Sequence, residues 1–269
     1  MNHIDIYKIL NKSNCRKCGL PTCMAFALAV TNENSLLQDC PFISKEQFER
    51  LAGHVITRDQ DEDLALTIAP MKKAIEGMNF SLIAEGLGAE IKGDDLQIRC
   101  FGKEFLITPF GEIKSQIHIN QWVVMPLLKY ILAGGSGGLT GKWVAFEELP
   151  GGLTMEQYIQ RRCEDPMRQL ADAHTDLFFN LLEIFGSSPA KGFSADYARV
   201  IHPLPRVPFL ILYWRPEDQF ESKLRILLDS STSRYLDSHS VYVLARGMVE
   251  MFKKIISRHE ELIPALLSL

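Results

Sequence analysis

The sequence predicts an α+β fold, in which a small helical module with four cysteines precedes a larger domain of mixed helices and antiparallel strands. Three observations predict this class. Four of the six cysteines lie within the first 40 residues. Between residues 89 and 113, short β-favouring runs alternate with glycine-containing turns. Longer stretches around them carry apolar residues at helical spacing. The pattern leaves open whether the larger domain also contains a parallel strand pair.

The composition is that of an ordinary globular protein. The chain has 269 residues, of which 46% are hydrophobic, enough for one large domain or two smaller ones. Its net charge of -4 does not favour binding to a polyanion such as DNA, so we expect no nucleic-acid partner. No window reaches the roughly 18 apolar residues of a membrane span, and the first residues lack the apolar region of a signal peptide. We therefore expect a cytoplasmic protein without a membrane span.

An acidic stretch at residues 58–63 marks the boundary between the two parts of the chain. It has the polar character of a linker or of an exposed helix start. We place the cysteine module at residues 1–60. The α+β domain, of uncharacterised type and a candidate for ligand or partner binding, takes residues 61–269.

The cysteine module is expected to contain three helices. Residues 5–10 form the first, and the apolar run after Pro21 and Thr22 begins the second. Ser44 with Gln47 three residues later forms a capping box, which predicts a third helix after the last of the four cysteines.

The larger domain is expected to begin with helices and then turn to strands. Residues 64–86 favour a helix interrupted at Pro70, and residues 89–113 contain three short runs that predict an antiparallel meander. The further expected elements are a helix at 123–132 capped by Asn120, a strand at 142–146, helices across 154–185 with Pro166 marking a break or a new helix start, strands near 197–201, 209–214 and 224–228, and a long amphipathic helix at 240–256.

The four clustered cysteines have the spacing Cys15-x2-Cys18-x4-Cys23-x16-Cys40. A 4Fe-4S cluster needs four thiolates that converge on it, and here a tight loop offers three while a returning segment offers the fourth. Six cysteines would also suit disulfides in a small secreted domain, but the clustering of four favours a metal site. The spacing therefore indicates one 4Fe-4S cluster bound by these four residues.

The residues around the four cysteines suit such a site. Gly19 and Pro21 let the loop bend round a compact cluster, and the start of the helix at Cys23 favours an anionic ligand set. Arg16 and Lys17 are candidates for screening the cluster charge or for docking an acidic partner. Four apolar residues of the same helix offer a wall that excludes water: Met24, Phe26, Leu28 and Val30.

Zinc is the main alternative, because four thiolates also satisfy a tetrahedral zinc ion. Structural zinc sites usually combine two C-x2-4-C knuckles, however, and this sequence has one. Buried cysteines without a metal are a weaker alternative, since four of them would have to cluster by accident. Cys100 and Cys163 lack a nearby cysteine or a distinctive basic context, so we expect them to be buried packing residues.

The run CRKCGLPTCMAFALAV, with the later DCP, resembles the small iron-sulfur module of the corrinoid iron-sulfur protein large subunit and of the RnfB subunit of Rnf complexes. In that module four cysteines bind a 4Fe-4S cluster, and Cys15, Cys18, Cys23 and Cys40 match them one for one. The resemblance covers about the first sixth of the chain. By analogy it implies a corrinoid as one acceptor, held by this chain or by a partner protein.

The remainder resembles an uncharacterised domain family that is often fused behind this module in anaerobic bacteria and archaea. The runs that carry this resemblance are FGKEFLITPFGEI, TGKWVAFEELPGG, VPFLILYWRPEDQF and LLDSSTSRYL. The second resemblance implies no particular chemistry. It favours an anaerobic, low-potential setting.

Polar features outside the cysteine cluster have structural explanations beside functional ones. The glycine run at 134–138 follows an expected helix, which favours a flexible loop over a lid or a phosphate-binding turn. His202 and His239 are candidate ligands for a metal or a corrinoid, although a hydrogen-bonded or exposed imidazole is the ordinary state. His54, His118 and His174 have no stronger claim. Residues at expected strand ends suit a site or a surface turn equally well: Trp214, Arg215, Glu217, Asp218 and Asp229.

Three functions follow from these observations. In the leading hypothesis the cluster passes single electrons, and the larger domain binds the acceptor or docks a redox partner protein. In the second, the protein is a non-catalytic binding or scaffold protein, and the cluster only stabilises the fold of the small module. In the third, the larger domain is an enzyme acting on a corrinoid or one-carbon substrate. Since the sequence has no hydrolytic or phosphoryl-transfer motif, we expect an electron-transfer or cofactor-binding protein rather than a stand-alone enzyme.

Overall fold

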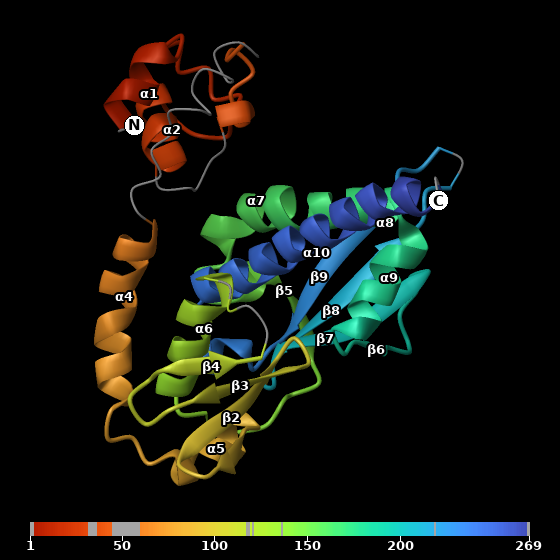
Figure 1. Cartoon of the computed structure of the whole chain (residues 1–269). Coiled ribbons are helices and arrows are strands. Elements are labelled where there is room, and N and C mark those ends of the chain that lie inside the picture. Colours follow the sequence, from red (N-terminus) through yellow and green to blue (C-terminus); the bar gives the residue numbers. More distant parts are fainter. Residues whose placement is uncertain are drawn as a thin grey trace. The chain divides into compact units, whose positions relative to one another are not determined.

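The computed structural model describes residues 3–31, 37–44, 60–116, 119, 121–135, 137–217 and 219–267. The chain divides into two compact units, Met1–Leu66 and Thr67–Leu269. The first, here called the cysteine unit, contains the four clustered cysteines. The second, the larger unit, contains both β-sheets (Figure 1).

The described part of the cysteine unit consists of two short helices, one 3-10 turn and the start of helix α4 (Gln60–Ile75), which continues into the larger unit. Helix α1 spans His3–Ile9 and helix α2 spans Cys23–Thr31, so the first two predicted helices are confirmed, and the 3-10 turn spans Leu37–Asp39. The third helix, expected after Ser44, lies outside the described residues. The two helices pack through a small buried cluster: Ile6, Leu10, Cys23, Phe26, Ala27, Leu37 and Cys40.

Helix α4 spans Gln60–Ile75 and continues through Pro70. The predicted interruption at this proline is therefore wrong. Proline fixes φ near the helical value and removes one hydrogen bond, so the cost falls on a single turn, and the rest of the helix can continue. The chain turns instead at Gly77, which has a φ of 80°, and helix α5 (Phe80–Leu87) begins after the cap Asn79.

The first sheet of the larger unit is an antiparallel meander, as predicted, with a fourth strand added. Its strands are β1 (Glu90–Lys92), β2 (Asp95–Cys100), β3 (Lys103–Ile107) and β4 (Ile113–Ser115), paired in that order. Alternate residues of β2 are buried, because successive side chains of a strand point to opposite faces of the sheet: Leu96, Ile98 and Cys100.

The second sheet has the strand order β5-β9-β8-β7-β6. These strands are β5 (Trp143–Ala145), β6 (Ser188–Pro189), β7 (Tyr197–Leu204), β8 (Val207–Trp214) and β9 (Lys223–Asp229). The central strand β8 is buried from Val207 to Tyr213, which explains its unbroken apolar sequence. Every strand pairing among the described residues is antiparallel. The α+β prediction is confirmed, without a parallel pair in that part of the chain.

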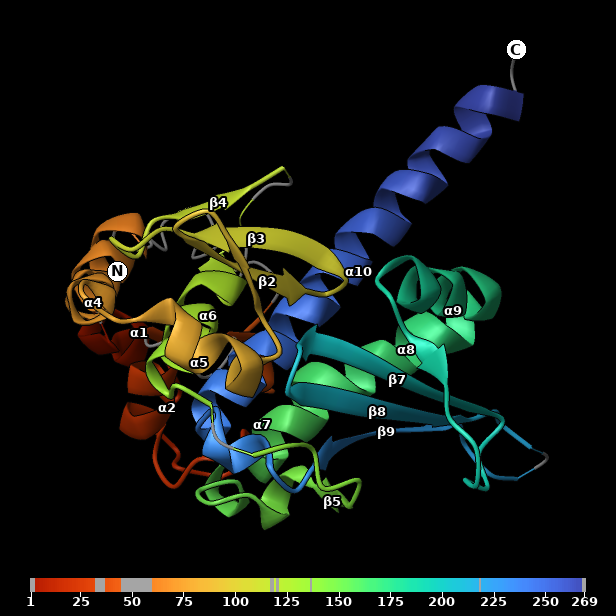
Figure 2. The same ribbon diagram turned by 90° about the horizontal axis from the view of Figure 1, so that it is seen from below.

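Helices pack on the second sheet and link it to the first. Their bounds are α6 Gln121–Leu132, α7 Glu156–Ile159, a π-helical turn Gln160–Glu164, α8 Asp165–Ala173, α9 Thr175–Ile184 and α10 Ser238–Leu267, with 3-10 turns at Phe146–Glu148, Leu153–Met155 and Thr232–Arg234. Pro166 lies in the first turn of α8, which confirms the prediction that it marks a new helix start. Helix α8 packs against β9, and the long helix α10 lies against α6, α7, α8 and α9 (Figures 1 and 2). None of the described helices is both long and apolar enough to cross a membrane.

The glycine run at 134–138 follows helix α6 as a loop, and its described residues are held on two sides. The backbone of Gly135 lies against Gly86 of α5: a Cβ added to Gly135 would come within 2.7 Å of the Gly86 carbonyl carbon. On the other side, the Tyr235 hydroxyl donates a hydrogen bond to the carbonyl oxygen of Gly137. The loop therefore packs between α5 and the segment that follows β9.

Replacing Gly135 with alanine is expected to lower the free energy of unfolding by about 2–4 kcal/mol, from a left-handed backbone and a steric clash together. Gly135 has a φ of 60°, and its Cβ would collide with backbone rather than with a movable side chain. Gly138→Ala is the matched control, since a Cβ there meets no atom within 4 Å. Denaturant unfolding measures both variants. Equal stability of the two would show that the contact with α5 does not exist in solution.

Candidate metal centre

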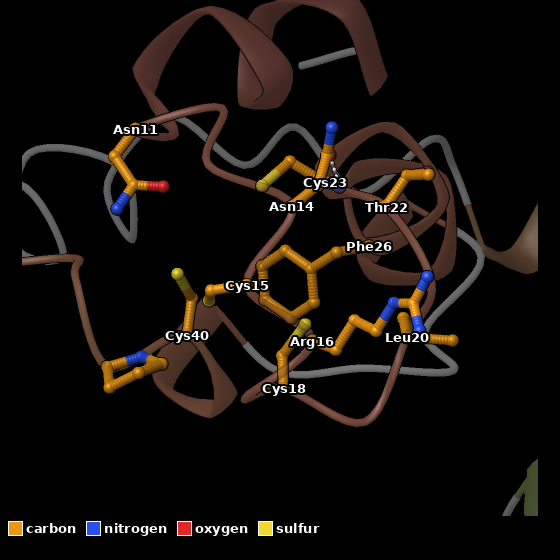
Figure 3. Close-up of a pocket in the computed structure, with 11 residues that line it drawn as sticks. Asn11, Asn14, Cys15, Arg16, Cys18, Leu20, Thr22, Cys23, Phe26 and Cys40 are labelled. Atoms are coloured by element: carbon orange, nitrogen blue, oxygen red, sulfur yellow. Dashed lines mark hydrogen bonds between the residues drawn. The ribbon is translucent and has the colours of Figure 1, made fainter.

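The structure brings the four clustered cysteines to one hollow in the cysteine unit (Figure 3). Cys23 and Cys40 are buried, whereas Cys15 and Cys18 are partly exposed. The full lining is Asn11, Asn14, Cys15, Arg16, Cys18, Leu20, Thr22, Cys23, Phe26, Cys40 and Pro41. Because this lining contains no carboxylate or imidazole, a metal centre here would meet soft thiolate donors, which suit iron-sulfur clusters and zinc.

The loop between α1 and α2 gains its curvature from left-handed backbone. Lys12, Asn14 and Arg16 have φ values of 57°, 48° and 60°, and Gly19 has 82°. The N–H of Gly19 donates to the carbonyl oxygen of Arg16 at 2.9 Å, which closes a tight turn. This turn holds Cys15 just before it and Cys18 inside it. Alternating left-handed residues of this kind are typical of loops that cradle anions with their N–H groups.

The start of helix α2 is capped from two sides. The hydroxyl of Thr22 accepts the N–H of Ala25 at 3.0 Å, a standard N-cap contact. The side-chain oxygen of Asn14 accepts the N–H of Cys23 at 2.7 Å. Asn14 thereby ties the cysteine loop to the first residue of α2 and fixes where the Cys23 side chain starts.

Backbone N–H groups contact two of the cysteine sulfurs. The N–H of Lys17 lowers the pKa of the Cys15 thiol below its ordinary value, and the Ser13 side chain adds to this effect. Burial raises the pKa of Cys40, although the N–H of Phe42 opposes the rise. Both N–H groups favour the thiolate form that a metal ligand requires.

The apolar wall predicted from α2 is partly wrong. Phe26 is buried and lines the hollow, so it fits the prediction. Met24 and Leu28 are 41% and 47% exposed, because they lie one helical turn apart on the face opposite to Cys23 and Phe26. Val30 packs against the small core of the unit instead.

The other candidate ligands do not join the cysteines. Nδ1 of His202 lies 3.2 Å from the carbonyl oxygen of Pro205, and His239 is exposed at the start of α10. His54 and His118 lie outside the described residues. Cys100 and Cys163 are buried as predicted, and burial raises the pKa of both thiols. Within the described ranges, no three His, Cys, Asp or Glu side chains are arranged to hold a single metal ion, and this includes the four cysteines, which line one hollow without converging on one point.

The residues predicted at strand ends have structural partners. Asp229 is 1% exposed and accepts five hydrogen bonds at the end of β9. The indole N–H of Trp214 donates to the carbonyl oxygen of Ser194, and the N–H of Arg215 donates to Asp196 at 2.8 Å. Glu217 forms a short bridge within its hairpin, and Asp218 lies outside the described residues.

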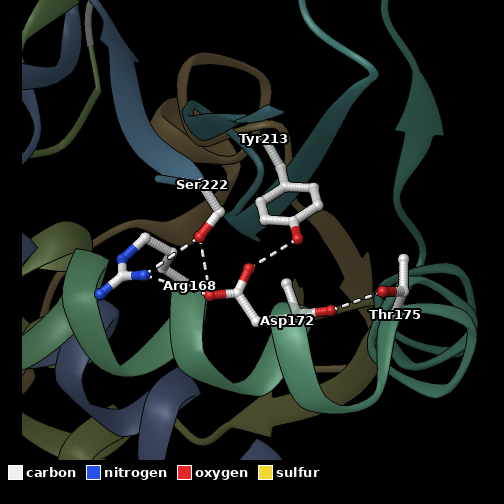
Figure 4. Close-up of polar contacts among 6 residues, drawn as sticks. Arg168, Asp172, Thr175, Tyr213 and Ser222 are labelled. Atoms are coloured by element: carbon white, nitrogen blue, oxygen red, sulfur yellow. Dashed lines mark hydrogen bonds and ion pairs between the residues drawn. The ribbon is translucent and has the colours of Figure 1, made fainter. Parts of the chain in front are cut away.

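A polar network around Asp172 was missed by sequence reasoning (Figure 4). Its carboxylate accepts the hydroxyls of Tyr213 and Ser222, both at 2.7 Å, and the Arg168 guanidinium at 3.1 Å. Arg168 and Asp172 are spaced i, i+4, which in a sequence indicates an exposed ion pair on a helix. The network ties α8 to β8 and to the segment before β9, so its role is structural.

Two family models match the chain. Residues 79–251, well over half of the chain, match the model described as "Domain of unknown function (DUF3786)". The chain belongs to this family. Residues 10–42 of this DUF3786 protein match a second model, described as "Putative Fe-S cluster". All four clustered cysteines fall inside the second match, which supports an iron-sulfur cofactor in the cysteine unit. Both parts of the predicted resemblance are confirmed.

Similar curated proteins match this DUF3786 chain over a limited part of its length. The acetyl-CoA decarbonylase/synthase complex subunit gamma of Methanocaldococcus jannaschii is 32% identical over 108 residues, 40% of this chain and 19% of that protein. The corrinoid/iron-sulfur protein large subunit of Moorella thermoacetica is 44% identical over 48 residues, 18% of this chain and 11% of that protein. The chain thus spans less than a fifth of the length of these relatives. No solved structure matches it.

Proposed function

We propose that this chain is an iron-sulfur redox protein in which Cys15, Cys18, Cys23 and Cys40 bind one 4Fe-4S cluster. The observation that carries the proposal is the gathering of these four thiols around one hollow that no carboxylate or imidazole lines. When bound, such a cluster supplies a one-electron couple, at a potential between about -700 and +450 mV. The cysteine unit then serves as the electron-carrying part of the chain.

The surrounding residues prepare the thiols for that role. The N–H groups of Lys17 and Phe42 favour thiolate at Cys15 and Cys40, and such contacts to sulfur are one means of setting a cluster potential. Asn14 fixes the start of α2, and buried Phe26 keeps water from one side of the hollow. These residues orient the ligands and control solvent access.

The proposed acceptor is a corrinoid in anaerobic one-carbon metabolism, held by the larger unit or by a partner protein. Two relatives support this class: one is named a corrinoid/iron-sulfur protein and another a subunit of an acetyl-CoA decarbonylase/synthase complex. Purified protein with a reduced cluster should change the cobalt absorption bands of added cobalamin if the chain binds the acceptor itself. Unchanged bands would leave a partner-held acceptor and would remove a corrinoid-dependent enzyme as a candidate.

Anaerobic purification tests the cluster itself. We expect iron and sulfide in the ratio of a 4Fe-4S cluster, and a reversible one-electron signal in an electron paramagnetic resonance titration. Serine at any of the four cysteines should remove most of the iron. Cys100→Ala, which also deletes a buried thiol, should leave the iron content unchanged. Zinc without sulfide in the purified protein would overturn the proposal.

A structural cluster is the second candidate function. It is favoured by the core of the cysteine unit, in which two of the seven described buried residues are the cysteines Cys23 and Cys40. In this case the iron and sulfide would be present. The titration would then show no reversible transition across the range accessible to such clusters.

A further inference from the structure

We propose that an acidic electron-carrier protein docks on an exposed edge formed by Arg16, Lys17 and Phe42, here called the basic edge. The redox step of this proposal rests on the proposed function. The docking surface itself is argued from exposure, contact and charge. Its test therefore has a binding measurement that does not depend on electron transfer.

The basic edge lies on the solvent side of the four cysteines. Arg16 and Lys17 are the two residues between Cys15 and Cys18, which are the partly exposed pair, whereas Cys23 and Cys40 are buried. An electron carrier that approaches from solvent reaches the site over the shortest path from this side. Arg16 itself lines the hollow, so the edge and the site share a boundary (Figure 3).

Lys17 and Phe42 expose their side chains on the basic edge, and their backbone N–H groups face the cysteine sulfurs. The Lys17 Nζ atom lies 5.3 Å from the centre of the Phe42 ring, a cation-π contact, and the ring is 47% exposed. The backbone N–H groups of the same two residues contact the sulfurs of Cys15 and Cys40. An exposed aromatic ring beside basic groups is the kind of anchor that protein interfaces favour.

The charge around the cysteines differs from that of the whole chain. Residues 11–22 contain Lys12, Arg16 and Lys17, all exposed, and no acidic residue; Asp39 beside Cys40 offsets one of these three charges, and the net charge of the whole chain is -4. This local positive field favours a partner whose docking surface is acidic, because complementary charges steer the encounter and set the orientation. The alternative is that the three basic groups only offset the charge of the cluster.

An acidic flavodoxin in its hydroquinone form is a suitable probe, because its flavin absorption is distinct from that of an iron-sulfur centre. In the transfer, the anionic hydroquinone loses one electron and becomes the neutral semiquinone. A 4Fe-4S cluster held by Cys15, Cys18, Cys23 and Cys40 would supply the one-electron acceptor for this step. No proton moves and no bond forms or breaks.

The test compares the full chain with the double variant Arg16→Glu/Lys17→Glu. At low ionic strength, about 0.02 M, we expect the variant to bind flavodoxin at least about tenfold more weakly and to accept its electron correspondingly more slowly. At about 0.5 M salt the difference should disappear. Lys191→Glu combined with Lys142→Glu is the matched control, because it makes the same change of net charge at exposed lysines of the larger unit. This control should bind as the unaltered chain does.

Reduction by methyl viologen radical, a small cation, separates docking from an altered centre. Lys17→Glu alone, which changes no side chain that lines the hollow, should bind flavodoxin more weakly and still be reduced by the viologen at least as fast as the unaltered chain. Equal flavodoxin affinity for the double variant and the unaltered chain at low salt would overturn the proposal that the basic edge is a docking site. Binding that depends on the two residues, without any electron transfer, would keep the docking surface and count against the proposed redox function instead.

Discussion

Replacing Asp229 with alanine is expected to lower the free energy of unfolding of the larger unit by about 3–5 kcal/mol. Its carboxylate accepts the N–H groups of Thr140, Gly141 and Ser231 and the hydroxyls of Thr140 and Ser231, at distances from 2.6 to 3.0 Å. Alanine would leave these donors, of which the two of Ser231 are buried, without their acceptor. It would also release the segment before β5 from the end of β9. Chemical denaturation followed by circular dichroism measures the change.

The pH dependence of the free energy of unfolding gives a second measure of how much the Asp229 carboxylate stabilises the fold. Burial opposes its ionisation, but the hydrogen bonds from Ser231 and Thr140 prevail and hold the pKa of Asp229 at about 2, below its ordinary value of 3.8. A lowered folded-state pKa stabilises the fold above the unfolded value, and this stabilisation is lost as the pH falls from about 4 to about 2. We expect a loss of about 2 kcal/mol over that window. Asp229→Asn, which keeps the shape, should not show this step, and an unchanged step in the asparagine variant would contradict the assignment.

Sequence reasoning succeeded where structure depends on local pattern. The strands β7, β8 and β9 and the helix α10 follow directly from apolar periodicity and turn residues. The pairing of β5 with β9 did not follow, because it joins segments far apart in the chain, as in Trp143 opposite Asp229. The helix through Pro70 was missed for the opposite reason: a local rule was applied where the surrounding turns continue the helix.

The cysteine spacing predicted the four thiols that line the hollow. It did not predict the backbone conformation of the loop that positions them. Three non-glycine residues, Lys12, Asn14 and Arg16, adopt left-handed conformations. Such conformations cost energy and persist only when surrounding contacts impose them, so a single sequence does not reveal them. Asn14 was the nearest available signal, because asparagine tolerates this region better than most residues. Its contact with Cys23 became visible only in three dimensions.

Removing the cluster is expected to unfold the cysteine unit while the larger unit stays folded. Two of the seven described core residues of the unit, Cys23 and Cys40, are themselves proposed ligands. A core limited to these described residues supplies too little buried apolar surface to offset the entropy of ordering the chain, so we expect the proposed cluster to supply the rest. The larger unit has its own extensive core and contains neither residue. Hydrogen exchange of the full chain, with the cluster intact and after oxidation with an iron chelator, measures each unit separately.

The expected result is a loss of protection in α1 and α2 to nearly the level of an unfolded chain, with protection in β8 and α10 unchanged. Cys23→Ser prepared anaerobically should match the oxidised protein. It removes one proposed ligand, and with it the cluster, without exposing other residues to oxidant. Cys163→Ala is the control for losing a buried thiol, since it lies in the larger unit at 0% exposure and should leave α1 and α2 protected. Full protection of both helices without the cluster would mean that the small apolar core is sufficient. The cysteines would then be free of any structural task, which would strengthen a purely redox role.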